Sequence, residues 1–595
     1  MEECLILLQK PEVEQYFHTV EIGTFSVSKD EKKLVFSTNL SGKYNLWAMD
    51  LPNNFPYQLT AINQSSSFIH IHEEEHLITA AFEHDGDENY QLHHLPLSGG
   101  KPVPFNKDEN MSACYNACTF NQEIYYSSNH ENPLLNIYRF DVKTNRKELL
   151  QSGKEAPIVV AAVSPNGSDY VFTETYTNTH AAGFYQADDK KIPLVPDPSS
   201  PHIIRDVRFA DEDTIYFLTN YQEEFSYLAS FTLSTNEFRQ VLKLKSEEIK
   251  MLTSNGNTFY LASEKGVKDH LYQFETTTGD LTSIDLPCDI LKKIDASSSG
   301  TLYALAMSSH RIDNIFKREA DGEWLMLTNN KALGIYDRNM IKPEVIRYPS
   351  YDGLSIEALL FKPDQDHIVK GTILWLHGGP QQAERMKYRP LIQYLVQSGY
   401  TIFAPNFRGS TGYGATFQKM VEKDWGGGPR LDCVAGMEWL IENGHASKGN
   451  ISVMGGSYGG YLSLLLAGRH NEYLCAVIDI FGISNLLTFV ENVPSSWRTL
   501  MNQMVGNPEE DYDKLVAASP ITYVDQMSKP MFILHGKNDP RVKTEESERI
   551  VGKMKEKGIS AEYLLFEDEG HGFSKKKNEM EANKRIRLFL DRIYK

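Results

Sequence analysis

The stretch Asn450-Ile-Ser-Val-Met-Gly-Gly-Ser-Tyr-Gly-Gly-Tyr461 decides the fold of the C-terminal part of this 595-residue chain. A short apolar run from Ile451 to Met454 leads into Gly455-Gly-Ser-Tyr-Gly459, and the apolar spacing beyond it becomes helical. The pattern predicts a strand, a sharp turn at Ser457 and a helix, an arrangement called a nucleophile elbow. The outer glycines are needed because a side chain there would clash with the crossing backbone. The pentapeptide alone is weak evidence, since any glycine-rich turn satisfies it.

Two polar loops downstream supply the partners that a serine nucleophile needs. Asp539 follows the apolar run from Met531 to Leu534, and His571 follows an apolar run that begins at Tyr563. The chain order Ser457, Asp539, His571, with each group at the carboxyl end of a strand, is that of α/β-hydrolases. We expect Ser457 to attack, His571 to carry the proton and Asp539 to orient the imidazole. Taken singly, the aspartate would be a solvated turn residue and the histidine a loop residue; their joint spacing favours a catalytic triad.

The segment Gly371-Thr-Ile-Leu-Trp-Leu-His-Gly-Gly-Pro380 is typical of a buried strand that runs into a glycine-rich loop. Such a loop supplies one N–H of an oxyanion hole, and Tyr458, the residue after the nucleophile, supplies the other. Glycine lets the backbone approach the substrate oxygen. We therefore expect Gly379 to be the donor from the loop, with Gly378 as the alternative.

Five motifs occur in a fixed order. They are His377-Gly-Gly-Pro380, Pro405-Asn-Phe-Arg-Gly-Ser-Thr-Gly-Tyr-Gly414, Gly455-Gly-Ser-Tyr-Gly-Gly-Tyr461, His535-Gly-Lys-Asn-Asp539 and Glu569-Gly-His-Gly-Phe573. In this order they resemble the prolyl oligopeptidase family of serine peptidases, and most of all its acylaminoacyl-peptidase branch. The resemblance extends over about 260 C-terminal residues and, by architecture alone, over the rest. It implies a propeller that caps an α/β-hydrolase domain and admits short peptides, with no cofactor.

An insertion into the hydrolase is expected from Phe481 to Tyr523. It contains Trp497 and Arg498, which are similar in placement to the aromatic–arginine pair that acylaminoacyl peptidases use near the S1 and S2 sites. The resemblance implies that Phe481, Trp497 and Arg498 bind substrate; the alternative is a surface arginine on a packed helix. A guanidinium at that place would donate hydrogen bonds to a peptide carbonyl and repel a free ammonium terminus, which favours N-blocked peptides.

The N-terminal half has a different pattern, with short alternating strands and turn clusters from Phe25 to about Thr328. Repeats begin near Phe25, Phe68, Asn116, Val159, Ile204, Ile249 and Ile290. A period of roughly 41 to 49 residues with four strands per unit predicts a seven-bladed β-propeller, with two β-sandwiches as the alternative. We expect a helical extension over residues 1–24 (helix Leu5 to Phe17), a propeller over 25–335 and an α/β-hydrolase domain over 336–595.

The pair Glu223-Glu224 raises the question of dipeptidyl specificity. Relatives that cleave dipeptides anchor the substrate amine with paired glutamates on the propeller. Here the pair falls between two strands of the fifth repeat, where a solvated hairpin is usual, and the flanking residues do not match the motif. We expect no anchoring role for these two carboxylates.

Composition excludes several classes of partner. A net charge of −19 argues against nucleic acid and against an anionic membrane surface. No apolar run approaches the roughly 18 residues of a membrane-spanning helix, and the N-terminus carries acids where a signal peptide needs bases. The six cysteines form no paired framework, and Cys114 and Cys118 lack a second ligand pair. We expect reduced thiols, no metal and a cytoplasmic location; a homo-oligomer stays open.

The function we expect is that of a serine peptidase that forms an acyl-enzyme and releases N-acylated amino acids from short peptides. A carboxylesterase is the first alternative, because the same triad acts on esters, whose leaving group needs less help than an amine. Dipeptidyl or oligopeptidase specificity is the second. A non-catalytic propeller scaffold is disfavoured because Ser457, Asp539 and His571 are all present.

Overall fold

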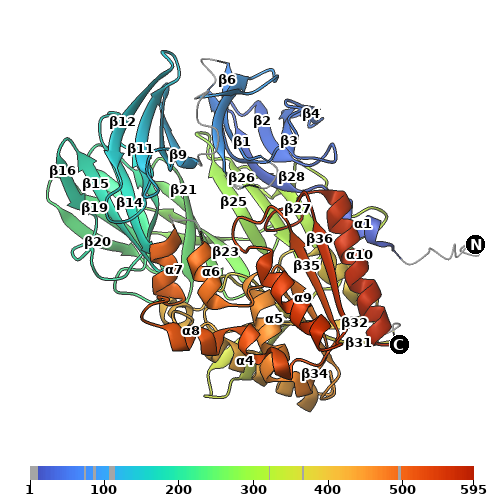
Figure 1. Cartoon of the computed structure of the whole chain (residues 1–595). Helices are drawn as coiled ribbons and strands as arrows, with labels where there is room; N and C mark the ends of the chain where they lie inside the picture. Colours follow the sequence, from blue (N-terminus) through green and yellow to red (C-terminus); the bar gives the residue numbers. More distant parts are fainter. Residues whose placement is uncertain are drawn as a thin grey trace, which may run out of the picture.

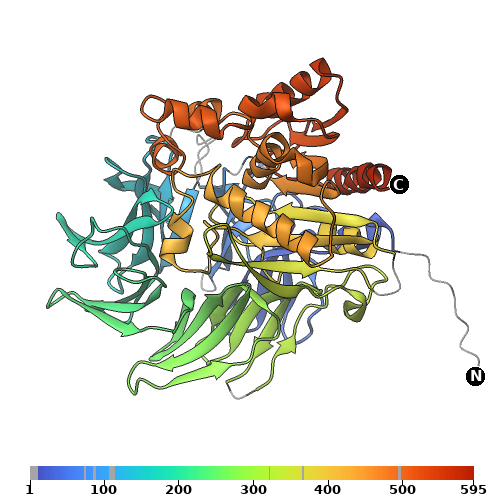
Figure 2. The same ribbon diagram turned by 90° about the horizontal axis from the view of Figure 1, so that it is seen from below.

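The computed structural model describes residues 11–72, 76–84, 87, 89–105, 114–320, 322–364, 368–493 and 497–595. It comprises seven four-stranded antiparallel sheets and one mixed eight-stranded sheet flanked by helices (Figure 1). Figure 2 shows that the yellow-to-red C-terminal part lies against one face of the blue-to-green N-terminal part. The seven sheets confirm the predicted propeller, and the alternative of two β-sandwiches is wrong.

Each blade is built from four consecutive strands. The first four blades are β1–β4 (Ile22–Val27, Lys33–Thr38, Asn45–Asp50, Tyr57–Gln58), β5–β8 (Ser66–His72, Leu77–Phe82, Gln91–Pro96, Val103–Pro104), β9–β12 (Cys114–Phe120, Glu123–Ser128, Asn136–Asp141, Arg146–Ser152) and β13–β16 (Ile158–Val163, Tyr170–Thr177, His180–Ala187, Lys190–Pro193). The last three are β17–β20 (Ile204–Phe209, Thr214–Thr219, Tyr227–Thr232, Glu237–Leu242), β21–β24 (Glu248–Asn255, Thr258–Lys265, Lys268–Glu275, Leu281–Ile284) and β25–β28 (Ile290–Ala296, Leu302–Ser308, Arg311–Arg318, Leu325–Met326).

The blades are stable only as a ring, because a four-stranded sheet alone leaves both of its apolar faces in water. Apolar clusters therefore form between neighbours: Val35 and Leu46 of the first blade pack with Ile71 of the second. The ring closes in the same way, since Phe25 of the first blade packs with Ile315 of the seventh. Adjacent blades thus supply each other's cores.

The eight-stranded sheet has the order β29-β30-β32-β31-β33-β34-β35-β36. Its strands are β29 (Glu344–Pro349), β30 (Ser355–Phe361), β31 (Gly371–Leu376), β32 (Tyr400–Asn406), β33 (Ile451–Gly456), β34 (Leu474–Ile480), β35 (Met531–Gly536) and β36 (Ala561–Phe566). The first two form the predicted hairpin, and from β32 to β36 neighbours are parallel. The carboxyl ends of β31 and β33–β36 therefore meet at one edge, which is where parallel α/β sheets carry their sites.

Helices cover both faces of this sheet. They are α2 (Pro390–Gln397), α3 (Ala415–Lys419), α4 (Gly428–Glu442), α5 (Tyr458–Arg469), α6 (Leu486–Asn492), α7 (Arg498–Met504), α8 (Tyr512–Ala518), α9 (Glu545–Glu556) and α10 (Lys576–Ile593). The predicted insertion between β34 and β35 is confirmed as α6–α8, and α7 contacts β14 of the fourth blade (Figure 1). The insertion therefore touches the propeller as well as the hydrolase.

The N-terminal helix α1 (Val13–Phe17) packs on the catalytic part of the chain. The ring centroids of Tyr16 and Tyr394 of α2 lie 5.6 Å apart, and Phe17 meets the same ring edge-on at 6.4 Å. Residues 1–10 lie outside the described residues. They include the first part, Leu5 to Lys10, of the helix expected from Leu5 to Phe17.

A buried ion cluster joins the sixth blade to the hydrolase. Nη2 of Arg385 donates to Oδ1 of Asp269 at 2.6 Å, and its Nη1 lies 3.0 Å from Oε2 of Glu264. Lys250 donates to the other oxygen of Asp269 at 2.7 Å. All of these side chains are largely or wholly removed from water, so loss of one partner leaves the others buried with incomplete charge compensation.

We predict that Arg385→Ala lowers the free energy of unfolding by about 3–5 kcal/mol, because it removes one partner of a buried ion pair. Differential scanning calorimetry should show a clear fall in melting temperature. Arg239→Ala is the matched control, since Arg239 pairs with Glu237 on the exposed surface and its loss should change little. Equal shifts for both variants would show that the cluster does not stabilise the interface.

Candidate active site

Ser457 lies on the sharp turn between β33 and α5, with backbone dihedrals of φ +57° and ψ −119°. Positive φ is costly for a residue with a side chain, so the surrounding structure must hold this turn in place. A Cβ on Gly459 would lie 2.0 Å from the carbonyl oxygen of Leu376, and one on Gly455 would lie 2.5 Å from the carbonyl carbon of Gly459. Both positions therefore require glycine, for the steric reason given above.

His571 and Asp539 lie in hydrogen-bond contact. Nδ1 of His571 lies 2.6 Å from Oδ2 of Asp539, and both side chains are buried. The other carboxylate oxygen accepts the N–H groups of Arg541 and Val542 at 2.8 and 2.9 Å. Burial by itself would raise the pKa of Asp539, but hydrogen bonds from His535 and His571 outweigh it and hold that pKa below its usual range. The carboxylate is thus ionised and faces the imidazole.

Phe481 connects the histidine loop with the elbow. Its ring centroid lies 4.6 Å from that of His571, and a Cβ on Gly456 would lie 3.3 Å from the Phe481 ring. The backbone on either side is fixed, because the N–H of Ser457 donates to Ile480 and the N–H of Phe481 donates to Leu534. The structure therefore places Phe481, predicted to bind substrate, against His571 and beside Gly456, the residue before Ser457.

The glycine-rich loop after β31 also lies at the elbow. A Cβ on Gly378 would lie 3.5 Å from Cβ of Ser457, and Gly379 has φ +124°, a conformation that side chains disfavour. Tyr458 is the first residue of α5, and the first N–H groups of a helix have no partner within the helix. Backbone donors from both segments are therefore available beside Ser457.

His377 holds this loop in place and does not face the triad. Its Nε2 lies 2.9 Å from Oγ of Ser410, and its ring stacks on Phe407 with centroids 4.1 Å apart. Burial lowers the pKa of His377 to about 4, so the ring is neutral at physiological pH.

Trp497 and Arg498 lie where the insertion approaches the aspartate loop. The guanidinium of Arg541, two residues after Asp539, lies over the Trp497 ring at 5.7 Å from its centroid. Arg498 is exposed, and its Nη2 donates to the carbonyl oxygen of Glu491 at 3.4 Å. Trp497 is therefore near the loop that carries Asp539, whereas the Arg498 side chain makes a long hydrogen bond to the backbone of α6.

Both carboxylates of the Glu223-Glu224 pair are engaged. Glu223 forms an ion pair with Lys243 of the same blade. Glu224 crosses to the hydrolase, where it accepts the N–H and the hydroxyl of Thr416 at 2.9 and 2.5 Å. The pair thus contributes to blade packing and to the contact between propeller and hydrolase.

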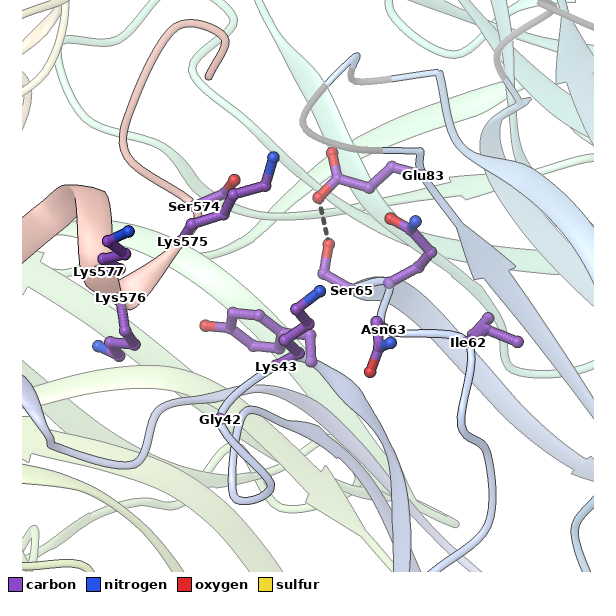
Figure 3. Close-up of a pocket in the computed structure, with 12 residues that line it drawn as sticks. Gly42, Lys43, Ile62, Asn63, Ser65, Glu83, Ser574, Lys575, Lys576 and Lys577 are labelled. Atoms are coloured by element: carbon purple, nitrogen blue, oxygen red, sulfur yellow. Dashed lines mark hydrogen bonds between the residues drawn. The ribbon is translucent and has the colours of Figure 1, made fainter. Parts of the chain in front are cut away.

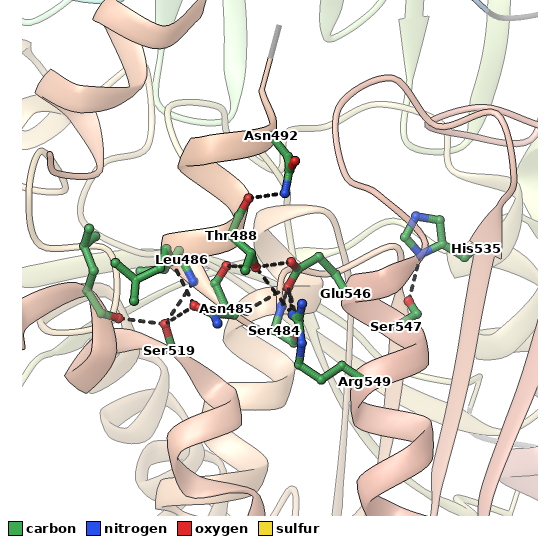
Figure 4. A network of polar contacts seen from close by, with 12 residues as sticks. Ser484, Asn485, Leu486, Thr488, Asn492, Ser519, His535, Glu546, Ser547 and Arg549 are labelled. Carbon is green, nitrogen blue, oxygen red and sulfur yellow. Dashed lines mark hydrogen bonds and ion pairs between the residues drawn. The ribbon is translucent and has the colours of Figure 1, made fainter. Parts of the chain in front are cut away.

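Sequence reasoning missed the polar contacts at the start of α9 (Figure 4). The buried carboxylate of Glu546 accepts the N–H groups of Ser484 and Asn485 at 3.0 and 2.8 Å, which fixes the chain just after Phe481. The next residue, Ser547, has its Oγ 2.7 Å from Nδ1 of His535. One turn of helix therefore supports both the insertion and the end of the strand before Asp539. Its sequence, Glu-Glu-Ser-Glu, gave no signal of these contacts because it looks like an ordinary acidic helix start.

His535 and Asp479 form a second buried polar group behind the triad. Nε2 of His535 donates to the carbonyl of Val542 at 2.9 Å and lies 3.5 Å from Oδ2 of Asp539. Oδ1 of Asp479 accepts the N–H of Gly482 at 2.8 Å, while its Oδ2 has no partner among the described residues. Burial raises the pKa of Asp479 to about 7, against a smaller lowering by His535.

Three further features of the described residues concern metal binding, membrane spans and cysteines. There, no three His, Cys, Asp or Glu side chains are grouped so as to hold a metal ion. Within the same residues, no helix has the length and apolar character needed to span a bilayer. Cys118, Cys288, Cys433 and Cys475 are free thiols, and Cys4 lies outside the described part of the chain.

Comparison with known proteins relates part of the chain to a family of peptidases. Residues 386–595 match the sequence profile of the prolyl oligopeptidase family. Dipeptidyl aminopeptidase BIII of Pseudoxanthomonas mexicana is 39% identical over 224 residues, which are 37% of this chain and 32% of the relative. Acylamino-acid-releasing enzyme of Arabidopsis thaliana is 26% identical over 227 residues, 37% of this chain and 30% of the relative.

Solved structures extend the likeness to the whole fold. The crystal structure of a puromycin hydrolase aligns with a TM-score of 0.86 over 98% of this chain and 96% of that one, at 16% identity. At such identity the likeness concerns the fold alone. By contrast, the chain spans only about a third of the length of these two curated relatives, so the activities in their names come to this chain only as proposals.

We predict that Asp479→Asn changes how stability depends on pH. The carboxyl pKa is about 7 in the folded state and about 3.9 in an unfolded chain, so the folded state binds more protons between these values. Raising the pH through this window therefore destabilises the wild type. The asparagine keeps the acceptor for Gly482 and cannot ionise. Between about pH 5 and about pH 8, the free energy of unfolding of the wild type should therefore fall by about 2–3 kcal/mol relative to that of the variant.

Thermal melts of both proteins across this pH range provide the measurement. Asp189→Asn, at an exposed position, is the matched control and should follow the wild type at every pH. If the Asp479→Asn and wild-type curves ran parallel, either the carboxyl would not titrate in the window or His535 would compensate for its charge.

Proposed function

We propose that this chain is a serine peptidase that hydrolyses short peptides through an acyl-enzyme. The observation that carries the proposal is the 2.6 Å contact between His571 and Asp539, with Phe481 packed against both His571 and the strained turn of Ser457. A catalytic triad needs a nucleophile, a base and a group that orients the base. The three side chains are assigned these roles in that order: Ser457, His571 and Asp539.

The steps follow from the roles. Oγ of Ser457 attacks the peptide carbonyl while Nε2 of His571 takes its proton, and Asp539 stabilises the imidazolium through the Nδ1 hydrogen bond. The imidazolium then gives the proton to the departing amine. Water enters, loses its proton to His571 and releases the acyl group from the serine. The negative oxygen of each tetrahedral intermediate accepts N–H bonds from Tyr458 and Gly379, or from Gly378 in its place.

The substrate we propose is a short peptide with a blocked N-terminus, from which an N-acylated amino acid is released. Two observations favour a blocked end over a free amine. Glu223 and Glu224 are already bound to Lys243 and Thr416, so they offer no free pair of carboxylates to an ammonium group. The insertion brings Trp497 against Arg541 of the aspartate loop, with Arg498 next to it in the sequence, and a relative in Arabidopsis is named an acylamino-acid-releasing enzyme.

Dipeptidyl specificity is the second candidate, because the bacterial relative at 39% identity is named a dipeptidyl aminopeptidase. Ester hydrolysis by the same triad is the third. Digestion of a peptide library with acetylated and free N-termini, read by mass spectrometry, separates the first two. The six cysteines are scattered along the sequence without a paired framework, which favours a reducing compartment, so we propose a cytoplasmic location. We also propose residues 336–595 as the catalytic domain and residues 25–335 as the propeller that caps it.

We predict that Ser457→Ala abolishes labelling by a fluorophosphonate probe and lowers kcat for peptides on the order of a millionfold, since the nucleophile is lost. Asp539→Asn should lower kcat by roughly ten thousandfold, because the amide leaves the wrong imidazole tautomer. Probe labelling and initial rates on an acetylated peptide are the measurements. Hydrolysis near the wild-type rate by a well-folded Ser457→Ala protein would remove Ser457 from the proposal.

We predict that Arg498→Ala lowers kcat/KM for acetylated peptides. The loss should correspond to about 1.5–3 kcal/mol of transition-state stabilisation, the typical value of a hydrogen bond from a charged group. Small p-nitrophenyl esters lack the carbonyl that this guanidinium would contact, so their hydrolysis should hardly change. Arg585→Ala, at an exposed position in α10, is the control variant. Equal losses on peptide and ester would assign Arg498 a structural role.

A further inference from the structure

A cavity of about 460 Å³ lies between the propeller and the segment that follows His571 (Figure 3). Loops of the first two blades contribute Lys43, Ser65 and Glu83, and the catalytic side contributes Ser574, Lys575 and Lys577. Figure 3 shows the α10 lysines on one side, Ser65 and Glu83 on the other, and Lys43 between them. Among the described residues, none of the proposed triad and none of the insertion lines this space.

The cavity carries an excess of positive charge. Lys575 is paired with Asp568, and Lys576 is paired with Glu21 and Glu579. Lys43 and Lys577 also line the space, and neither has a carboxylate partner among the described residues. Two ammonium groups are therefore left to attract an anion, against the single carboxylate of Glu83, which accepts a hydrogen bond from Ser65. Their placement favours a ligand with at least one negative charge.

The cavity wall is tied closely to the catalytic histidine. Lys575 follows His571 by four residues, and four residues of chain span at most about 14 Å. The buried carboxylate of Glu569 fixes this segment by accepting the N–H groups of Ser574 and Lys575 at 2.9 and 3.1 Å. The backbone of Lys575, which leads into the other lysines, is therefore held within reach of the His571 imidazole.

We propose that this cavity receives the carboxylate of the leaving peptide, a role that rests on the peptidase function proposed above. The departing amine takes its proton from His571, so the leaving peptide lies on the side of that residue. A leaving peptide of two or three residues extends about 7–11 Å, which matches the reach from His571 to the lysines. Lys43 and Lys577 hold its negative end, so the enzyme prefers substrates that are short on the leaving side and end in a free carboxylate.

The test compares acetylated peptides that are identical except for a C-terminal acid or amide three residues beyond the cleaved bond. Wild type should cleave the acid faster. Lys43→Ala and Lys577→Ala should each reduce this preference about threefold to fivefold, the range of an exposed ion pair, and the double variant about tenfold or more. Rates on the amide should be unchanged, and added salt should weaken the preference of the wild type.

Matched controls are Lys190→Ala, at an exposed position of the fourth blade, and Lys584→Ala, two turns further along α10. Both should keep the wild-type preference. An amidated peptide with Asp in place of Asn at the last position tests whether a side-chain carboxylate serves as well as a terminal one. Equal rates on acid and amide by an active wild type, or a preference that survives both cavity substitutions, would overturn the proposal.

A second measurement separates failure of this proposal from failure of the peptidase function. Triglycine and triglycinamide are compared as inhibitors of p-nitrophenyl acetate hydrolysis, which needs the triad and no peptide substrate. Stronger inhibition by the acid, lost in the Lys43→Ala/Lys577→Ala protein, supports the cavity even if no peptide is cleaved. Equal inhibition by the two compounds contradicts the cavity even if peptides are good substrates.

Discussion

The close approach of α5 to the end of β31 is the constraint on which the site depends. The carbonyl of Leu376 lies where only a glycine fits at position 459, and this contact fixes the sharp turn that exposes Ser457. The residue after Leu376 begins the loop that carries Gly378 and Gly379. A single backbone contact thus sets the positions of Ser457, the N-terminus of α5 and the loop of Gly378 and Gly379 relative to one another, and any side chain at Gly459 would displace all three.

The other half of the site is held by side chains that are distant in sequence. Glu546 secures the chain after Phe481, and Ser547 secures His535, so the first turn of α9 supports both neighbours of the His571–Asp539 pair. Buried carboxylates are costly unless they are fully hydrogen-bonded, and Glu546 meets that condition with donors from the backbone and from Thr488. Rigid support of this kind is what a catalytic hydrogen bond requires, because small displacements of the imidazole weaken proton transfer.

The sequence predicted those features that are recorded locally. Blade number follows from the spacing of repeats, and the elbow follows from glycines within five residues. Contacts such as Arg385 with Asp269, 116 residues apart, or Glu224 with Thr416, 192 residues apart, leave no local signal, because either residue alone looks like a solvated surface charge. The acidic start of α9 was equally uninformative, since an acidic first turn is explained by the helix dipole alone.

The two sides of the contact between propeller and hydrolase differ physically. At the fifth and sixth blades, Glu224 and the Arg385 cluster fill the interface with hydrogen-bonded charges. At the first two blades the interface holds a cavity of about 460 Å³. Breaking the first side would expose buried charges without partners, which costs several kcal/mol, whereas the second already has room for solvent or a ligand. Under the proposed function, a peptide product that leaves from His571 would therefore meet space on the lysine-lined side and a closed, ion-paired surface on the other.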